Sequence, residues 1–275
     1  MTPFRKMQGL GNDFAVFDAR TAPIPINSEQ AKKLADRHFG IGCDTLVVIL
    51  PGGAKADATL RFFNADGGEV GACGNATRCV ARLLMDERGL ARVQLESNGG
   101  TLLCSDAGKG LVTVDMGEPG LDWQKIPMSE ARDTLQFQFD LEGRMLTASA
   151  VSMGNPHCVL FVGDADKAPV AQIGPLIENH PLFPQRVNVE FAQVLDRSRI
   201  RMQVWERGVG ITLACGTGAA ATAVAAIRKG MIDRKVELIL DGGSLTLEWR
   251  EEDGHVLMTG PAVTSFMGEV DLARL

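Results

Sequence analysis

The chain has 275 residues, of which 45% are hydrophobic and 23% charged, and its formal net charge is −6. This length allows one or two domains, and the composition is ordinary for a soluble globular protein. The negative charge, without a cluster of lysines and arginines, argues against nucleic-acid binding. No stretch reads as a signal peptide or as a membrane span, which needs roughly 20 apolar residues. We therefore expect a cytoplasmic protein that binds neither nucleic acid nor membrane.

Short runs rich in β-branched and aromatic side chains predict strands in both halves of the chain. In chain order these runs are residues 14–17, 45–50, 60–63, 93–96, 101–103, 237–240 and 245–249. The fourth and fifth runs flank Asn98-Gly99-Gly100, and the last two flank Asp241-Gly242-Gly243. Both tripeptides are turn signals, so each of these pairs of runs is predicted to form a hairpin.

Four helices are predicted between these strands. Asn27 and Gln30 have the spacing of a capping box for the first helix, which would end near His38. The others are expected at residues 74–87, 166–178 and 216–230. The second and fourth helices are the principal ones, and each ends near a glycine, as helix C-termini often do.

A Gly/Pro signal at Gly117-Glu118-Pro119, after a strand, predicts a domain boundary. The equivalent Gly260-Pro261 leaves a short C-terminal stretch that we expect to complete the first domain. The predicted domains are residues 1–118 with 263–275, and residues 119–262. Each half has strands around one principal helix, so the expected fold class is α/β (α+β) with two similar domains.

Two cysteines lie in near-copies of one motif, 142 residues apart: Ala72-Cys73-Gly74-Asn75-Ala76 and Ala214-Cys215-Gly216-Thr217-Gly218. Further pairs keep an offset of 142 or 143 residues in the same order, among them Gly11-Asn12 with Gly154-Asn155, Thr45 with Asn188, and Asn64 with Glu206. An internal duplication explains these anchors better than two unrelated Cys-Gly dipeptides. A period this long indicates two domains rather than a solenoid.

Both cysteines stand where a principal helix begins. A helix N-terminus offers unpaired N–H groups and the positive end of the dipole, which lower the pKa of a thiol. The N–H groups of Gly74, Asn75, Gly216 and Thr217 could cradle a carboxylate. A thiolate and a thiol on opposite sides of a bound amino acid could remove a Cα proton from one face and return one to the other, which is racemisation without a cofactor. A lone cysteine is more often a small buried hydrophobe, but the duplicated setting favours catalysis.

Two other motifs are candidates for supporting roles. His157, in Asn155-Pro156-His157, could act as a base near neutral pH or orient one, although a lone histidine is more often structural. Glu206 could shift the pKa of a cysteine while Arg207 binds a substrate carboxylate. The alternative is that the two form a surface ion pair, which would contribute little to stability. The remaining cysteines, at positions 43, 79, 104 and 158, read as free structural thiols, and no metal site is predicted.

Taken together, these motifs resemble the diaminopimelate epimerase family. The matching segments span the chain: residues 7–14, 63–67, 72–75, 152–157, 205–208 and 214–218. The resemblance implies two pseudo-symmetric domains, each a curled, mostly antiparallel sheet or barrel around a central helix, with the active site in the cleft between them. It implies interconversion of LL- and meso-2,6-diaminopimelate, without pyridoxal phosphate or metal, in the route to lysine and peptidoglycan. We also expect a homodimer; the chain has no tyrosine, so Phe266 would replace any tyrosine contact near the C-terminus.

The resemblance also implies roles for single residues. Cys73 and Cys215 would be the two acid/base groups, with His157 supporting Cys73 and Glu206 supporting Cys215. The substrate, largely its non-reacting centre, would be held by Asn12, Thr45, Asn64, Asn155, Asn188, Glu206 and Arg207. Its reacting carboxylate would be held by the N–H groups at Gly74, Asn75, Gly216 and Thr217. The chain departs from the commonest family pattern at Thr45, Ala76 and Ile211, which affects recognition of the distal end of the substrate.

Two other functions are weighed against this one. A racemase or epimerase of another amino acid could use the same fold, but Arg207 and the asparagine set favour a substrate with a second amino-acid head. A non-catalytic amino-acid-binding protein could have kept the cleft and lost the chemistry. Retention of both cysteines, with His157 and Glu206, speaks against that reading.

Overall fold

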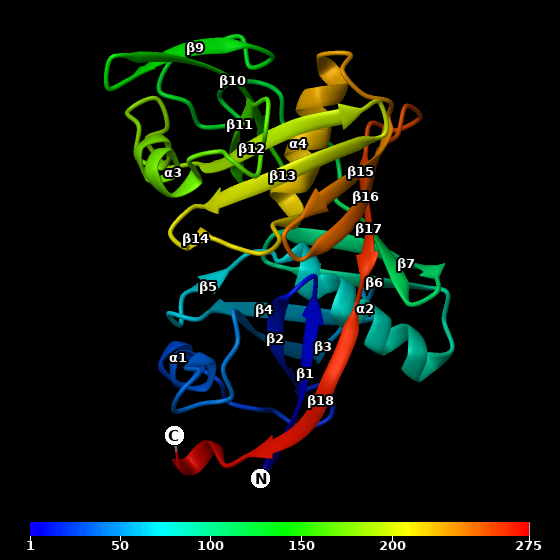
Figure 1. Ribbon diagram of the computed structural model, residues 1–275. Coiled ribbons are helices and arrows are strands. Elements are labelled where there is room, and N and C mark those ends of the chain that lie inside the picture. The colour runs from blue at the N-terminus through cyan, green and yellow to red at the C-terminus, as the bar shows by residue number, and fades with distance from the viewer. Residues whose placement is uncertain (275) are drawn as a thin grey trace. The chain divides into compact units, whose positions relative to one another are not determined.

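The structure is a computed structural model that describes residues 1–274 (Figure 1). Residue 275, the last of the predicted first domain, lies outside the described residues. The chain divides into two compact units, the first formed by Met1–Asp115 with the chain from Thr259 onward, and the second by Met116–Met258. The C-terminal segment thus returns to the unit in which the chain began.

Unit 1 is built on a sheet in which β18 and β1 lie at one end and β8 at the other. Its strands are β1 (Thr2–Gly9), β2 (Asn12–Asp18), β3 (Thr45–Pro51), β4 (Ala58–Asn64), β5 (Glu69–Val70), β6 (Arg92–Ser97), β7 (Gly100–Gly108), β8 (Leu111–Asp115) and β18 (Val263–Val270). The pairing order is β18–β1–β2–β3–β4–β6–β7–β8, with β5 on the end of β4. The part of β17 (Val256–Pro261) that belongs to this unit reaches β8, where the hydroxyls of Thr259 and Thr113 are 2.7 Å apart. Since β17 leads directly into β18, the sheet curls back toward its own first edge.

Unit 2 repeats this arrangement. Its strands are β9 (Phe137–Leu141), β10 (Arg144–Ser152), β11 (Pro156–Phe161), β12 (Asn188–Asp196), β13 (Arg199–Glu206), β14 (Gly210–Ile211), β15 (Lys235–Leu240) and β16 (Gly243–Trp249). They pair in the order β9–β10–β11–β12–β13–β15–β16, with β14 on the end of β13.

The two units share one pattern of strand directions. In unit 1, β2–β3 and β4–β6 are parallel and the other pairs are antiparallel. In unit 2, β11–β12 and β13–β15 are the parallel pairs. The parallel pairs stand at equivalent places in the two strand orders. The predicted fold of two pseudo-symmetric units, each with a mostly antiparallel sheet, is confirmed.

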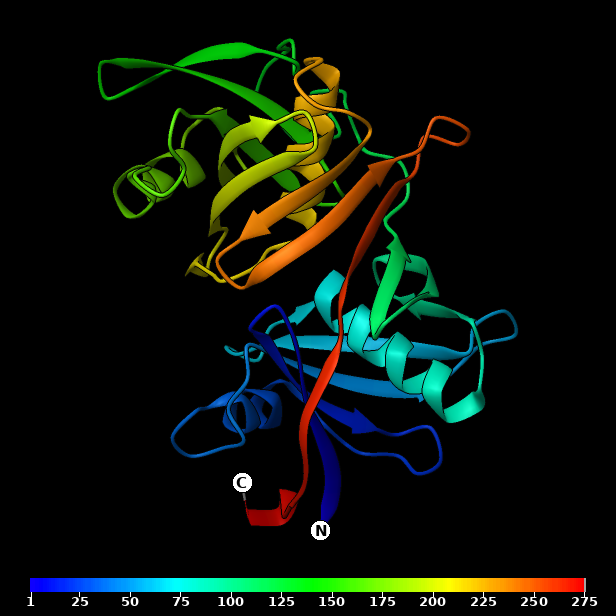
Figure 2. The same cartoon turned by 45° about the vertical axis from the view of Figure 1, so that its right-hand side comes forward.

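One helix forms the centre of each unit. Helix α2 (Gly74–Arg88) packs against β1, β2, β3, β6, β7 and β8 in unit 1, as Figure 2 shows. Helix α4 (Gly216–Arg228) packs against β10, β11, β12, β15 and β16 in unit 2. Alanines and glycines make up most of α4, so the surrounding backbone approaches it closely and the helix is buried over most of its length. Gly89, in a left-handed conformation with φ of +65°, ends α2 as predicted.

The two smaller helices also form, with shifted ends. Helix α1 (Ser28–Ala35) begins with the predicted capping box: Gln30 N donates to Asn27 Oδ1 over 3.0 Å, and Asn27 N donates to Gln30 Oε1 over 3.1 Å. It ends before His38 because the Asp36 carboxylate accepts from the next free N–H groups and turns the chain. Helix α3 (Val170–Glu178) begins four residues late because the Asp164 carboxylate holds the preceding segment in a turn.

Each unit has its own apolar core. In unit 1, Leu34 of α1 packs in one fully buried cluster with Phe17, Leu46 and Phe63. In unit 2, Phe137, Phe183, Phe191 and Ile177 form an equivalent cluster against α3. These cores fix the strands whose ends carry the predicted site residues.

Candidate active site

Cys215 is the N-cap residue of α4 and is only 5% exposed. Its sulfur accepts from the backbone N–H of Gly218 over 3.4 Å and lies 3.5 Å from the Thr217 hydroxyl. Burial, followed by the charges of Glu206 and Glu190, raises the pKa of the thiol well above the ordinary value, and the two hydrogen bonds only oppose this. A helix N-terminus was expected to lower the pKa of this thiol, but for Cys215 burial and two carboxylates shift the pKa upward.

Glu206 stands at the end of β13, beside Cys215. Its carboxylate accepts hydrogen bonds from the Thr212 hydroxyl and from the Cys215 thiol. Burial raises the pKa of Glu206, and these hydrogen bonds and the charge of His157 oppose the rise. The structure thus places Glu206 in direct contact with the cysteine that it was predicted to support.

His157 lies on β11, and both of its ring nitrogens are engaged. Nδ1 is 2.6 Å from Oε1 of Glu190 on the neighbouring strand β12, and Nε2 is 3.0 Å from Oδ1 of Asn155. His157 and Glu190 are both completely buried. Glu190 was not among the predicted residues. Its signal in the sequence is a carboxylate inside the apolar run Val189-Glu190-Phe191, where an uncompensated charge is costly.

A second carboxylate holds the turn that carries Arg207. Glu178, at the end of α3, accepts from Trp205 Nε1 over 2.6 Å and from Gly208 N over 2.9 Å. The Arg207 backbone N–H donates to Oδ1 of Asn188, 2.9 Å away. The Arg207 guanidinium donates to a backbone carbonyl and, within residues 1–274, makes no ion pair. It is therefore a partly buried cation that can still accept an anionic partner.

In unit 1, Cys73 is the N-cap residue of α2. Asn75, in the first turn of α2, donates from Nδ2 to Oδ1 of Asn12 over 3.2 Å. Thr45 on β3 lies opposite Asn64 on β4 in the antiparallel register. The structure thus pairs Asn12 with Asn75, and Thr45 with Asn64, although the members of each pair were predicted from separate motifs.

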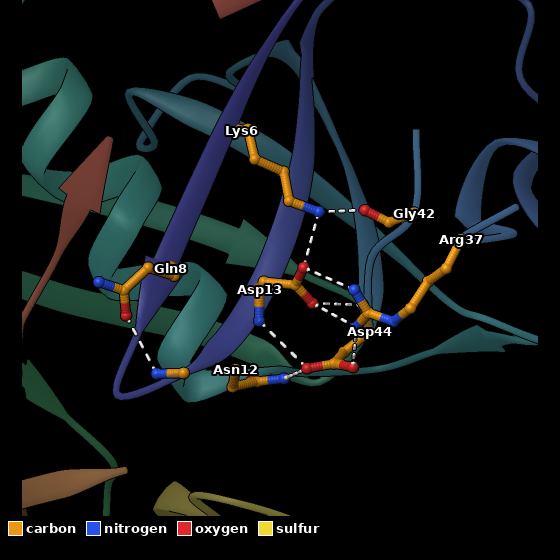
Figure 3. Close-up of polar contacts among 8 residues, drawn as sticks. Lys6, Gln8, Asn12, Asp13, Arg37, Gly42 and Asp44 are labelled. Atoms are coloured by element: carbon orange, nitrogen blue, oxygen red, sulfur yellow. Dashed lines mark hydrogen bonds and ion pairs between the residues drawn. The ribbon is translucent and has the colours of Figure 1, made fainter. Parts of the chain in front are cut away.

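A cluster of four charged side chains supports Asn12 (Figure 3). Lys6 Nζ lies 2.7 Å from Asp13, and Arg37 donates to both Asp13 and Asp44. Asp44 Oδ2 in turn accepts from Asn12 Nδ2 over 3.0 Å. Burial alone would raise the pKa of Asp13, but the hydrogen bonds from Arg37 and Lys6 outweigh it and hold the pKa well below its usual range. Asp44, which fixes the Asn12 amide, was also missed from the sequence.

The other cysteines have no comparable surroundings. Burial raises the pKa of Cys43 to about 11 and those of Cys79 and Cys104 to about 12, and Cys158 is shifted upward for the same reason. None of the six cysteines, all of which lie among the described residues, forms a disulfide. Within residues 1–274 no three acidic, histidine or cysteine side chains are grouped to hold a metal ion, and no helix has the length and apolarity of a membrane span.

Solved structures of distant relatives share the fold of this chain. A probable proline racemase of Agrobacterium radiobacter K84 aligns with a TM-score of 0.72 and 17% identity, covering 99% of this chain and 93% of that one. A hydroxyproline epimerase of Agrobacterium vitis aligns with a TM-score of 0.71 and 15% identity, covering 98% and 90%. At these identities the likeness shows the fold alone.

Sequence comparison shows the family to which the chain belongs. The sequence profile described as diaminopimelate epimerase matches residues 4–121 and 149–265. A diaminopimelate epimerase of Phenylobacterium zucineum is 54% identical over 274 residues, covering 98% of this chain and 97% of the relative. One from Rhodospirillum centenum is 53% identical over 268 residues, covering 97% and 91%. The chain belongs to the diaminopimelate epimerase family.

Proposed function

We propose that the protein interconverts LL- and meso-2,6-diaminopimelate, in the route to lysine and peptidoglycan, with Cys73 and Cys215 as its two acid/base groups. The substrate follows from the family to which the whole chain belongs. The observation that carries the mechanism is the duplication itself: each unit has a cysteine as the N-cap residue of its central helix. One substrate carbon has two faces, and a reaction that inverts it needs one proton-transfer group on each.

The reaction is a balanced exchange of protons. A thiolate removes the Cα proton and becomes a thiol, while the thiol of the other cysteine donates a proton to the opposite face and becomes a thiolate. The carbanion that forms between these steps spreads its charge into the carboxylate, where the N–H groups of Gly74, Asn75, Gly216 and Thr217 can stabilise it. Because the pKa of Cys215 is raised, we assign it the role of the thiol in the free enzyme.

Each cysteine has a proposed partner. Glu206 supports Cys215, and its hydrogen bond to that thiol favours this assignment. His157 is proposed to support Cys73. The non-reacting centre of the substrate is assigned to Asn12, Thr45, Asn64, Asn155, Asn188, Glu206 and Arg207. Arg207 suits a distal carboxylate because its planar guanidinium can donate two parallel hydrogen bonds.

Isotope exchange tests this proposal. The protein is incubated with LL-diaminopimelate in heavy water, and deuterium at Cα and the appearance of the meso isomer are followed by NMR. Wild-type protein is expected to do both, and Cys73→Ala and Cys215→Ala are each expected to lose epimerisation. Normal turnover in either alanine variant would defeat the two-base mechanism, and wild-type protein inactive on this substrate would defeat the assigned activity.

We also propose that the protein acts as a homodimer in the cytoplasm. Strand β18 supports the dimer because three of its large apolar side chains are exposed: Val263 by 44%, Phe266 by 52% and Met267 by 71%. Phe266 also makes an edge-to-face contact with Phe4, which fixes its ring. Light scattering on Met267→Asp should give a monomer; an unchanged dimer would remove β18 from the interface.

A further inference from the structure

Four hydrogen bonds link a buried carboxylate to the sulfur of Cys215. Glu190 Oε1 is 2.6 Å from His157 Nδ1, and His157 Nε2 is 3.0 Å from Asn155 Oδ1. Asn155 Nδ2 donates to Thr217 Oγ1 over 3.3 Å, and that hydroxyl lies 3.5 Å from the Cys215 sulfur. All five residues belong to unit 2. The chain of bonds therefore runs without interruption from Glu190 to Cys215.

The donors and acceptors of this chain give it a direction. Asn155 turns its oxygen toward His157 and its nitrogen toward Thr217, so His157 Nε2 must carry a hydrogen and Thr217 must accept from Asn155. The Thr217 hydroxyl hydrogen is then left to point at Cys215. An ionised Glu190 stabilises the doubly protonated ring of His157, which is the state that supplies a hydrogen at both nitrogens. A neutral ring with its hydrogen on Nδ1 would reverse the chain, and Thr217 would then turn its hydroxyl away from Cys215.

The surroundings of Glu190 make its burial unfavourable for stability, which indicates that this residue has another role. Within residues 1–274 its second oxygen, Oε2, is buried and has no hydrogen-bond partner. An apolar side chain at this position of β12 would avoid that desolvation penalty. Gly218 makes room for the carboxylate, because a Cβ at that position would stand 2.7 Å from Glu190 Oε1.

We propose that Glu190 is a positioning residue of the epimerase, which sets the direction of the chain through His157, Asn155 and Thr217 so that it ends in a hydroxyl donated to the Cys215 sulfur. This rests on the proposed function, in which Cys215 must become a thiolate in each catalytic cycle. Hydrogen bonds in such a chain polarise one another, so the last donor is stronger than an isolated hydroxyl.

A hydrogen-bond donor at Cys215 favours its thiolate, which the surroundings otherwise disfavour. Burial is the largest cause of its raised pKa, and the carboxylates of Glu206 and Glu190 add to it. The hydrogen bonds from Thr217 and from the Gly218 N–H are what oppose these effects. Glu190 thus acts in two opposite ways: its charge disfavours the thiolate directly, and its hold on His157 favours the thiolate through the chain.

These opposite effects give the proposal a sharp test. Cys215 alkylation by iodoacetamide is measured at one mildly alkaline pH, by mass spectrometry of its peptide, in a double-mutant cycle of Glu190→Gln and Thr217→Val. With Thr217→Val the chain no longer reaches the sulfur, so Glu190→Gln should speed alkylation by removing a nearby charge. With Thr217 present, the same substitution also removes the charge that polarises the hydrogen bonds leading to the sulfur. The ratio of the alkylation rate in Glu190→Gln to that of its parent should therefore be at least about threefold smaller with Thr217 present than in the Thr217→Val background.

Control variants distinguish an effect of the hydrogen-bond chain from an effect of misfolding. Thr217→Ser keeps the hydroxyl, so Glu190→Gln should change the Cys215 alkylation rate in this background as it does in wild type. Glu252→Gln removes an equal charge from an exposed position of unit 2 and should leave the alkylation rate unchanged. NMR of ¹⁵N-labelled histidine, with His157 assigned by His157→Gln, should show a protonated Nε2 in wild-type protein.

Equal effects of Glu190→Gln in the two backgrounds would overturn the proposal. So would an unprotonated Nε2 in wild-type protein, a result that needs no variant at position 190 to fold. Neither measurement uses substrate. A result against the hydrogen-bond chain is therefore distinguishable from a lack of epimerase activity on diaminopimelate.

Discussion

Gly218→Ala is predicted to damage catalysis by a steric route alone, because it leaves every side chain of the site unchanged. The added Cβ would stand 2.7 Å from Glu190 Oε1 and 3.3 Å from the Cys215 sulfur. An ordinary contact begins near 3.4 Å, so Oε1 must retreat by about 0.7 Å, the difference between these two distances. Since Glu190 is completely buried and bonded to His157 over 2.6 Å, this movement lengthens the bond that begins the chain to Cys215.

The expected loss in kcat is about 10-fold to 100-fold, the range that misplacements approaching 1 Å produce in active sites. Stability should fall by no more than about 2 kcal/mol. Alanine favours a helix over glycine by about 1 kcal/mol, and crowding opposes this by roughly 1–3 kcal/mol. The assay is steady-state epimerisation in both directions, together with urea unfolding. Gly163→Ala is the matched control, because a Cβ there meets nothing within 4 Å. Wild-type kcat in folded Gly218→Ala would refute the reasoning.

Three further substitutions or measurements follow from the same geometry. Arg207→Lys should raise KM about tenfold or more with little change in kcat, because lysine cannot make the paired hydrogen bonds of a guanidinium; an unchanged KM in initial-rate assays would remove Arg207 from substrate binding. Cys215 in free wild-type protein should be alkylated more slowly than a free thiol near neutral pH and speed up as pH rises, because its pKa is raised; rapid neutral alkylation would contradict this. Asp13→Asn should destabilise the protein by about 1–2 kcal/mol near neutral pH, since Lys6 and Arg37 lose their shared carboxylate. The pKa of Asp13 is lowered on folding, so its contribution is present above the usual carboxyl pKa of 3.8 and is lost as pH falls. The deficit of the variant in urea unfolding should therefore shrink in acid, and a deficit independent of pH would point to packing instead.

Local signals made much of the fold predictable. The capping box at Asn27 and Gln30 and the glycine after α2 depend on neighbours in the sequence, so they could be read without the structure. The duplication around Cys73 and Cys215 was equally visible, because it preserves motif and spacing. Helix ends near Asp36 and Asp164 were misplaced by three and four residues, since their position depends on which N–H groups a side-chain carboxylate captures.

The residues that the sequence did not reveal act through contacts between distant segments. Glu190 meets His157 because β11 and β12 are parallel neighbours, although 33 residues separate the two. Asp44 meets Asn12 across 32 residues, and Glu178 meets Trp205 across 27. The sequence marks Glu190 as a carboxylate within an apolar run, but a single sequence does not identify the partner of such a residue. The raised pKa of Cys215 was missed for a related reason: burial, the largest cause, and the carboxylates of Glu206 and Glu190 depend on segments distant in the sequence.

The central claim is that two thiols address opposite faces of one carbon. A crystal structure of the protein with a bound substrate analogue tests it most directly. The account predicts that the Cys73 and Cys215 sulfurs both contact the Cα of the analogue, one from each face, with its carboxylate at the two helix N-termini. A Cα reached by only one sulfur, or by both from the same side, would contradict the account.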